Sequence, residues 1–164
     1  MKLIQYKLGI LILILFSSCK KERVEKKSVF IKTWYDTERV VPYTATLIIN
    51  KDHTFKFTGG ACTARFYSNG KWIEKKDTLI LNSGFPKECL NLREFGRMCY
   101  SNEEIENIRF LKTKAGCEVK NDDEFENFRD AKFYLRNDSL IFKKDKKENC
   151  TEYEIRFYKA KKVR

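Results

Sequence analysis

Short runs in which apolar and polar residues alternate are the feature that most constrains how this chain folds. Phe55 and Phe57 flank Lys56, and the final run, residues 151–158, alternates aromatic or aliphatic residues with charged ones. A period of two is that of a β-strand with one buried face and one face in water. We therefore expect the chain to be built from half-buried strands.

Three segments have the composition of β-hairpins, in which two β-rich runs flank a short polar turn. They join residues 44–49 to 54–58, residues 71–74 to 78–81, and residues 132–135 to 139–142. We expect Gly59-Gly60 to end the first hairpin. We expect Ser68-Asn69-Gly70 to form a turn before the second, because glycine adopts positive φ without a steric penalty.

The middle of the chain has a weaker pattern. Apolar residues within 86–102 recur at helical spacing, which predicts one short helix or an ordered loop. Residues 107–112 are predicted to form a strand, and residues 121–130 a helical turn or an irregular loop. The total, about seven to nine short strands, predicts a mainly β fold: a small antiparallel barrel or a two-sheet sandwich.

The first residues have the layout of a secretory signal peptide. Lys2 and Lys7 precede an apolar run from Leu8 to Phe16, and Ser17-Ser18 then lead to Cys19. Small residues directly before a cysteine resemble the lipobox of bacterial lipoproteins. The resemblance implies cleavage before Cys19, acylation of that cysteine with chains such as palmitate, and a stable membrane anchor. The alternative is an ordinary signal peptide whose cleavage site lies near a cysteine.

Four parts are expected along the chain. They are a lipoprotein signal peptide (1–18), a charged tether (19–28), a single β-rich domain (29–160) and a basic tail (161–164). The formal net charge is +11, and it becomes +9 once the two lysines of the leader are removed. The basic runs, residues 20–27 and 159–164, are read either as solvated segments or as contacts to anionic head groups.

We expect no nucleic-acid partner. We expect the protein to be located at the outer membrane of a diderm bacterium, on the periplasmic face of that membrane.

Five cysteines remain if Cys19 carries lipid: Cys62, Cys89, Cys99, Cys117 and Cys150. An odd number allows at most two disulfides and leaves one thiol, and the sequence does not select the pairing. A local Cys89–Cys99 loop and a long-range Cys62–Cys150 link are both open. The spacing lacks the close cysteine pairs of a structural zinc site, so we expect no metal and no cofactor.

The sequence shows no motif of a known catalytic site. His53 is expected to be an exposed turn residue, and Cys62 a disulfide cysteine at a strand end. The segment Asp122-Asp123-Glu124 is expected to be a solvated acidic loop, because it lacks the spacing of a calcium-binding loop. Seven aromatic residues are read as core, with a glycan-stacking face as the alternative: Trp34, Tyr35, Phe55, Phe57, Phe66, Tyr67 and Trp72.

Residues 46–82 resemble small lipocalin-like lipoproteins of diderm bacteria. The resemblance is carried by Leu47-Ile48-Ile49-Asn50-Lys51-Asp52-His53-Thr54-Phe55, by Gly70-Lys71-Trp72 and by Asp77-Thr78-Leu79-Ile80-Leu81. It implies an up-and-down β-barrel, in a group whose function is often unassigned.

Three functions follow as hypotheses. The first is a non-enzymatic envelope lipoprotein that binds an anionic envelope component or a partner protein. The second is an inhibitor or accessory subunit, whose partner must be acidic because like charges oppose docking. The third is a hydrolase with a carboxylate site that no sequence motif marks.

Overall fold

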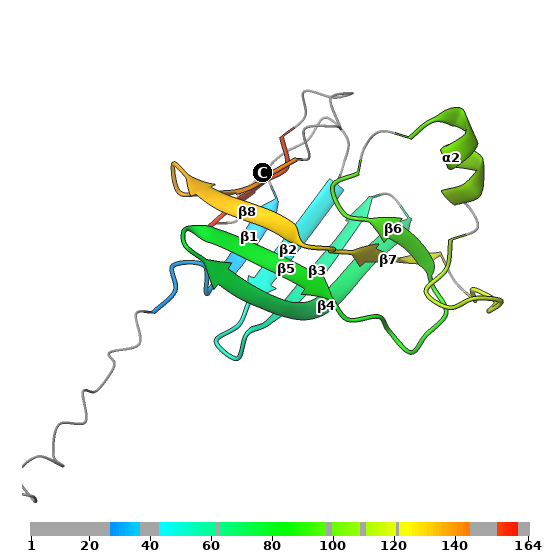
Figure 1. Cartoon of the computed structure of the whole chain (residues 1–164), viewed down its shortest axis with the longest axis horizontal. Coiled ribbons are helices and arrows are strands. Elements are labelled where there is room, and N and C mark those ends of the chain that lie inside the picture. The colour runs from blue at the N-terminus through cyan, green and yellow to red at the C-terminus, as the bar shows by residue number, and fades with distance from the viewer. Residues whose placement is uncertain are drawn as a thin grey trace, which may run out of the picture.

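The computed structural model describes residues 27–36, 43–61, 63–97, 100–108, 111–120, 122–144 and 154–160. These residues form ten strands and one helix (Figure 1): β1 (Thr33–Asp36), β2 (Tyr43–Ile49), β3 (Thr54–Ala61), β4 (Ala64–Lys75), β5 (Thr78–Ser83), β6 (Asn91–Glu94), α2 (Asn102–Ile108), β7 (Asp123–Asn127), β8 (Ala131–Arg136), β9 (Ser139–Phe142) and β10 (Arg156–Tyr158).

Eight of the strands close into an antiparallel β-barrel, which confirms the predicted fold class. Going around the barrel, the order is β1-β2-β3-β4-β5-β8-β9-β10, and β10 pairs with β1 to close the ring. Each barrel strand therefore pairs with its neighbour in this chain order. An insertion, residues 84–127, separates β5 from β8 and contains β6, α2 and β7.

Side chains fill the barrel. Alternate residues of each strand point inward, as the period of two predicts, and an eight-stranded barrel is just wide enough to be filled in this way. The buried core consists of Phe30, Trp34, Ala45, Leu47, Ile49, Phe55, Phe57, Phe66, Trp72, Leu79, Leu81, Phe128, Ala131, Phe133, Leu140, Ile155 and Phe157. Five of the seven aromatic residues expected in the core are among them, whereas Tyr35 and Tyr67 are only half-buried.

The two ends of the barrel differ. At one end, which we call the turn end, short turns close the hairpins β2–β3, β4–β5 and β8–β9. At the other, the insertion end, the chain leaves β5 and returns through β7 to β8; β6, β7 and α2 lie together at the right in Figure 1.

Strand β7 takes the place of β5 beside the first half of β4. Strand β5 pairs with the second half of β4, and β7 pairs in parallel with Arg65–Tyr67. The hydroxyl of Ser83 anchors the changeover: it lies 2.7 Å from the buried Ser68 hydroxyl and accepts a 2.8 Å hydrogen bond from the Phe128 amide. Buried hydroxyls need such partners, so this contact holds the insertion against the barrel.

Phe95, directly after β6, caps the core at the insertion end. Its ring stacks on Phe128 at a centroid distance of 4.0 Å and lies edge-on to Phe57 and Phe142. The chain turns away at Gly96, which has a φ of 77°, and a Cβ there would lie 2.3 Å from the Phe142 ring. Only glycine fits this position, because both the backbone conformation and the space exclude a side chain.

Two glycine predictions were wrong. Strand β3 continues through Gly59 and Gly60 to Ala61, and Gly70 lies inside β4 rather than in a turn. Gly70 pairs with residues on both sides, and a Cβ there would lie 2.1 Å from the carbonyl oxygen of Asn82. The glycine therefore permits a close backbone approach, not a positive φ.

The middle of the chain also departs from expectation. The middle contains one short helix, as one of the two predicted alternatives has it, but the helix begins only at Asn102, and β6 lies within residues 86–102, the segment predicted as a short helix or an ordered loop. Residues 121–130, predicted to be a helical turn or irregular loop, contain β7. Residues 107–112, predicted as a strand, supply the end of α2 and an isolated bridge from Lys112 to Asn91, with residues 109–110 outside the described chain. The last predicted strand, residues 151–158, contains β10 (Arg156–Tyr158); Glu154 and Ile155 precede that strand, and residues 151–153 lie outside the described chain.

Candidate functional site

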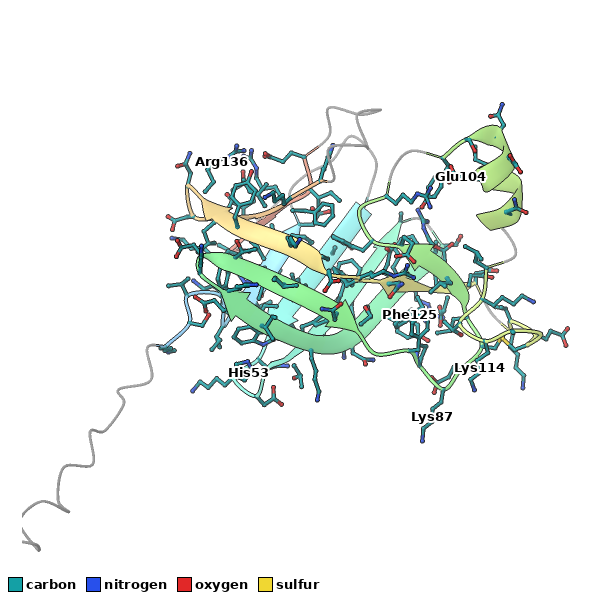
Figure 2. The ribbon with its side chains drawn as sticks, viewed as in Figure 1. His53, Lys87, Glu104, Lys114, Phe125 and Arg136 are labelled. Atoms are coloured by element: carbon teal, nitrogen blue, oxygen red, sulfur yellow. A yellow bond between two sulfur atoms is a disulfide. The ribbon has the colours of Figure 1, made fainter. Side chains whose placement is uncertain are left out.

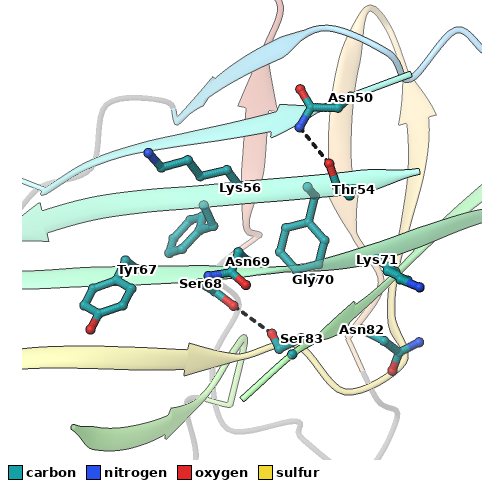
Figure 3. Close-up of a pocket in the computed structure, with 13 residues that line it drawn as sticks. Asn50, Thr54, Lys56, Tyr67, Ser68, Asn69, Gly70, Lys71, Asn82 and Ser83 are labelled. Atoms are coloured by element: carbon teal, nitrogen blue, oxygen red, sulfur yellow. Dashed lines mark hydrogen bonds between the residues drawn. The ribbon is translucent and has the colours of Figure 1, made fainter. Parts of the chain in front are cut away.

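A surface depression of about 720 Å³ lies over β3, β4 and the end of β5. Figure 3 shows it with Lys56 on β3, and Asn69 and Lys71 on β4. The lining residues are Asn50, Thr54, Phe55, Lys56, Phe57, Tyr67, Ser68, Asn69, Gly70, Lys71, Asn82, Ser83 and Gly84.

Strand register brings the polar residues of this depression together. Lys56 pairs with Asn69, and Lys71 pairs with Thr54 on one side and with Asn82 on the other. Lys56 and Lys71 are therefore diagonal neighbours on the same face, which corresponds to a separation of about 7–8 Å between backbones. We call these five residues, Thr54, Lys56, Asn69, Lys71 and Asn82, the lysine face.

No residue lining the depression carries a carboxylate. In the described part of the chain, neither Lys56 nor Lys71 forms an ion pair, and both are exposed. The arginines behave differently. All six that are described form ion pairs: Arg65–Asp123, Arg93–Glu124, Arg97–Glu104, Arg129–Glu94, Arg136–Glu154 and Arg156–Glu154.

This division between cations has a physical reason. The planar guanidinium fits a carboxylate geometrically and is weakly hydrated, whereas the ammonium of lysine is a compact and strongly hydrated charge. Two of the arginine pairs join the insertion to the barrel: Arg65 on β4 with Asp123 on β7 at 2.8 Å, and Arg129 with Glu94 at 3.2 Å. The lysines of the face remain available for a ligand.

Two acidic environments border the depression. Asp52, in the β2–β3 turn, accepts hydrogen bonds from the hydroxyl and the amide of Thr54, and these bonds lower its pKa. On the other side, burial and then the charges of Glu88 and Asp123 raise the pKa of Tyr67. The phenol of Tyr67 therefore stays protonated at neutral pH and remains a hydrogen-bond donor.

The donors that the depression offers are chiefly the ammonium groups of Lys56 and Lys71 and the side-chain amide of Asn69, because the hydroxyl of Thr54 already donates to Asp52 and the amide of Asn82 to Asp130. Such a surface suits anionic ligands, since hydrogen bonds from charged donors are the stronger ones. It is open and shallow, so binding there depends on several weak contacts acting together. Screening by salt must weaken it, because these charges are exposed.

The described cysteines form one disulfide, between Cys89 and Cys117, with Cα atoms 5.9 Å apart. The local Cys89–Cys99 loop considered from the sequence is therefore excluded. The bond ties the segment before β6 to residues 111–120, which run beside β6: Leu92 donates a 2.9 Å backbone hydrogen bond to Leu111. Cys19, Cys62, Cys99 and Cys150 lie outside the described residues.

Two further expectations concern single side chains. His53 is exposed in the β2–β3 turn as expected, with its ring 4.7 Å from that of Trp72. The acidic segment is not a solvated loop, because Asp123 and Glu124 belong to β7 and pair with arginines. Among the described residues, no three His, Cys, Asp or Glu side chains lie close enough to hold a metal ion.

Sequence reasoning missed the lysine face. The alternation predicts only that Lys56 is the polar member of a half-buried strand, and the run Ser68-Asn69-Gly70 predicts a turn at Asn69. The sequence does carry a signal for it: Lys56 on one strand, and Asn69 and Lys71 on the next, occupy the positions of the alternating pattern that point away from the core. This signal locates the lysine face only if the register between β3 and β4 is known. A turn at Ser68-Asn69-Gly70 excludes the pairing that β3 makes with this part of β4.

Comparisons of the chain with protein-family models, with curated proteins and with solved structures find no match. In the described part of the chain, no helix has the length and apolar character needed to cross a bilayer.

Proposed function

We propose that this protein is a lipid-anchored lipoprotein of the cell envelope whose lysine face binds an anionic glycan. It acts as a binding module and not as an enzyme. Acyl chains on Cys19 hold it at the outer membrane, on the periplasmic side, and residues 19–28 separate the barrel from the lipid. The lipobox-like sequence before Cys19 supports the anchor, and the +9 charge of the processed chain supports an anionic target.

The observation that carries the proposal is that Lys56 and Lys71 form no ion pair with any described residue and lie in a depression whose lining has no carboxylate. Threonine, asparagine and tyrosine side chains line the depression together with the two lysines, whose side chains extend toward opposite ends of it (Figure 3). Hydroxyl and amide groups match the hydroxyls of sugars, and the ammonium groups match acidic substituents. This mixture favours an acidic glycan over a purely apolar partner.

Binding to polygalacturonate, a carboxylated polysaccharide, tests the lysine face. We expect the full chain in detergent to bind it, and Lys56→Glu/Lys71→Glu to weaken binding at least tenfold. The matched control is Lys87→Glu/Lys114→Glu, which makes the same charge change on loops of the insertion (Figure 2) and should bind as the unmodified chain does.

Three results would contradict this assignment. One is equal loss of binding in the two double variants, which indicates attraction by net charge alone. Another is binding that does not respond to salt. The third is capture, by crosslinking in cells, of one acidic protein that is lost in Lys56→Glu/Lys71→Glu; that result would assign the face to an accessory subunit.

The anchor is tested separately. In cells that receive labelled palmitate, we expect the full chain to take up label and to sediment with outer membranes. The Cys19→Ala variant should lose both properties. Label in that variant, or an unlabelled but secreted wild-type chain, would replace the lipoprotein assignment with that of an ordinary exported protein.

A further inference from the structure

A second pocket lies at the insertion end, on the far side of β5 from the lysine face. It has a volume of about 430 Å³, within the range of about 300–1,000 Å³ of small-molecule sites, and barrel mouths are a common place for such sites. We call it the mouth pocket. Its lining residues are Glu94, Phe95, Arg129, Asp130, Ala131, Lys132, Phe142, Lys143 and Lys144.

Two phenylalanine rings form the apolar part of the mouth pocket. Phe95 and Phe142 pack edge to face with their centroids 5.3 Å apart, and both are only partly buried against the core. Phe95 also stacks on Phe128, so the interior beyond it is occupied. A ligand must therefore lie on these rings at the mouth and cannot enter the barrel.

The carboxylates of the pocket already have partners. Glu94 accepts hydrogen bonds from Asn127 at 2.9 Å and from Arg129 at 3.2 Å. Asp130 accepts one from the side chain of Asn82 at 3.1 Å. These contacts occupy both acidic groups within the protein.

Lysines from β8 and from the end of β9 also line the mouth pocket. The amide of Lys143 donates a 2.8 Å hydrogen bond to the carbonyl of Lys132, which places the two residues side by side on β8 and at the end of β9. Both side chains are exposed, and neither has an ion pair within the described residues. Lys144 adds a third cation to the lining.

We propose that the mouth pocket binds a small organic anion that carries an apolar ring beside its acidic group. The ring lies against Phe95 and Phe142, and the carboxylate, sulfonate or phosphate is held by Lys132 and Lys143. Desolvated aromatic contacts supply affinity, and the paired cations select for charge. This site shares no lysine with the lysine face and does not rest on the glycan proposed there, although Asn82 of that face is hydrogen-bonded to Asp130 of the pocket.

Fluorescence titration with 8-anilino-1-naphthalenesulfonate tests the pocket, since this probe combines an apolar ring system with a sulfonate. N-phenyl-1-naphthylamine has the same rings without the charge. For the native full chain, verified by near-ultraviolet circular dichroism, we expect at least tenfold tighter binding of the sulfonate. Lys132→Ala/Lys143→Ala should remove that preference by weakening sulfonate binding about tenfold, with little change for the neutral amine.

The matched control is Lys56→Ala/Lys71→Ala, which removes two cations from the lysine face and should bind the sulfonate as the unmodified chain does. Equal affinity for the charged and neutral probes would overturn the proposal. So would sulfonate binding that survives in Lys132→Ala/Lys143→Ala, or that falls equally in both lysine variants. Exposed lysines tolerate alanine, so these variants should fold.

Discussion

The two ends of this barrel are closed by different means. At the turn end, each hairpin closes through residues that are neighbours in sequence, and four of them have positive φ: His53, Lys76, Asn137 and Asp138. At the insertion end, closure depends on contacts between distant segments: the Phe95 cap, the Cys89–Cys117 disulfide and the arginine pairs of β7. One end of the barrel is thus stabilised by contacts that are local in the sequence, and the other by contacts between segments far apart in the sequence.

The difference bears on function. The mouth pocket lies at the insertion end, where packed aromatic rings and lysines meet, and the lysine face lies on the barrel wall. Tight turns leave little room for a ligand, whereas long connections bring side chains together from several elements. The comparison predicts that substitutions at the insertion end lower the free energy of unfolding more than substitutions in the turns do.

The largest effect should come from Phe95→Ala. Removing a packed phenylalanine leaves a cavity, and we expect a loss of about 3 kcal/mol in the free energy of unfolding. Urea denaturation measures it. Phe85→Ala is the control, because Phe85 belongs to the same insertion but is 56% exposed, and it should cost less than about 1 kcal/mol. Equal costs would show that Phe95 does not cap the core.

Loss of the disulfide should come next. Cys89→Ser/Cys117→Ser removes a bond between residues 28 positions apart, and we expect a cost of about 2–3 kcal/mol. Hydrogen exchange should locate the effect. Under conditions in which amides exchange through local opening and not through complete unfolding, the β6 amides should exchange faster and those of β2 and β3 should change little. Uniformly faster exchange across the barrel would mean that the stabilities of the two ends are coupled, which would contradict the comparison.

A smaller effect of opposite sign is expected at the turn end. Lys76 has a φ of 57°, which glycine adopts more easily, so Lys76→Gly should stabilise the protein by about 0.5 kcal/mol. The neighbouring Lys75 lies in β4, and Lys75→Gly should destabilise by about 0.5–1 kcal/mol. Thermal melts of both variants check the signs, and destabilisation by Lys76→Gly would refute the local account of this turn.

The smallest effect concerns pH. Because hydrogen bonds from Thr54 lower the pKa of Asp52, the charged carboxylate favours the folded β2–β3 turn. This contribution is present above the unfolded pKa and is lost as pH falls through the lower folded value. An NMR titration of the Asp52 carboxyl carbon should therefore have its midpoint below the ordinary value of 3.8. A midpoint at or above 3.8 would exclude the turn contact.

Much of the barrel was predictable. Three hairpins were placed correctly because alternation and turn residues act within a few positions of each other. The failures cluster where contacts are distant. Gly70 looked like a turn residue, although its role is to let Asn82 approach β4, and the strand nature of β7 depends on a parallel pairing with β4.

The candidate sites were less predictable for the same reason. A lysine in an alternating strand is normally just an exposed residue of the solvated face. No feature of the neighbouring sequence distinguishes Lys56 from Lys75. The distinction arises because strand register sets Lys56 beside Lys71 without a carboxylate, and because Glu94 and Asp130 have partners elsewhere.

The sequence by itself determined the strands of the hairpins, the turn end and the mainly β class, because hydrophobic period and turn chemistry are local properties. Only the tertiary structure decided the closure of β10 on β1, the path of the insertion, the Cys89–Cys117 pairing and the positions of the unpaired lysines. Each of these depends on packing and charge between segments far apart in the chain, and such contacts leave no periodic signal in either segment alone.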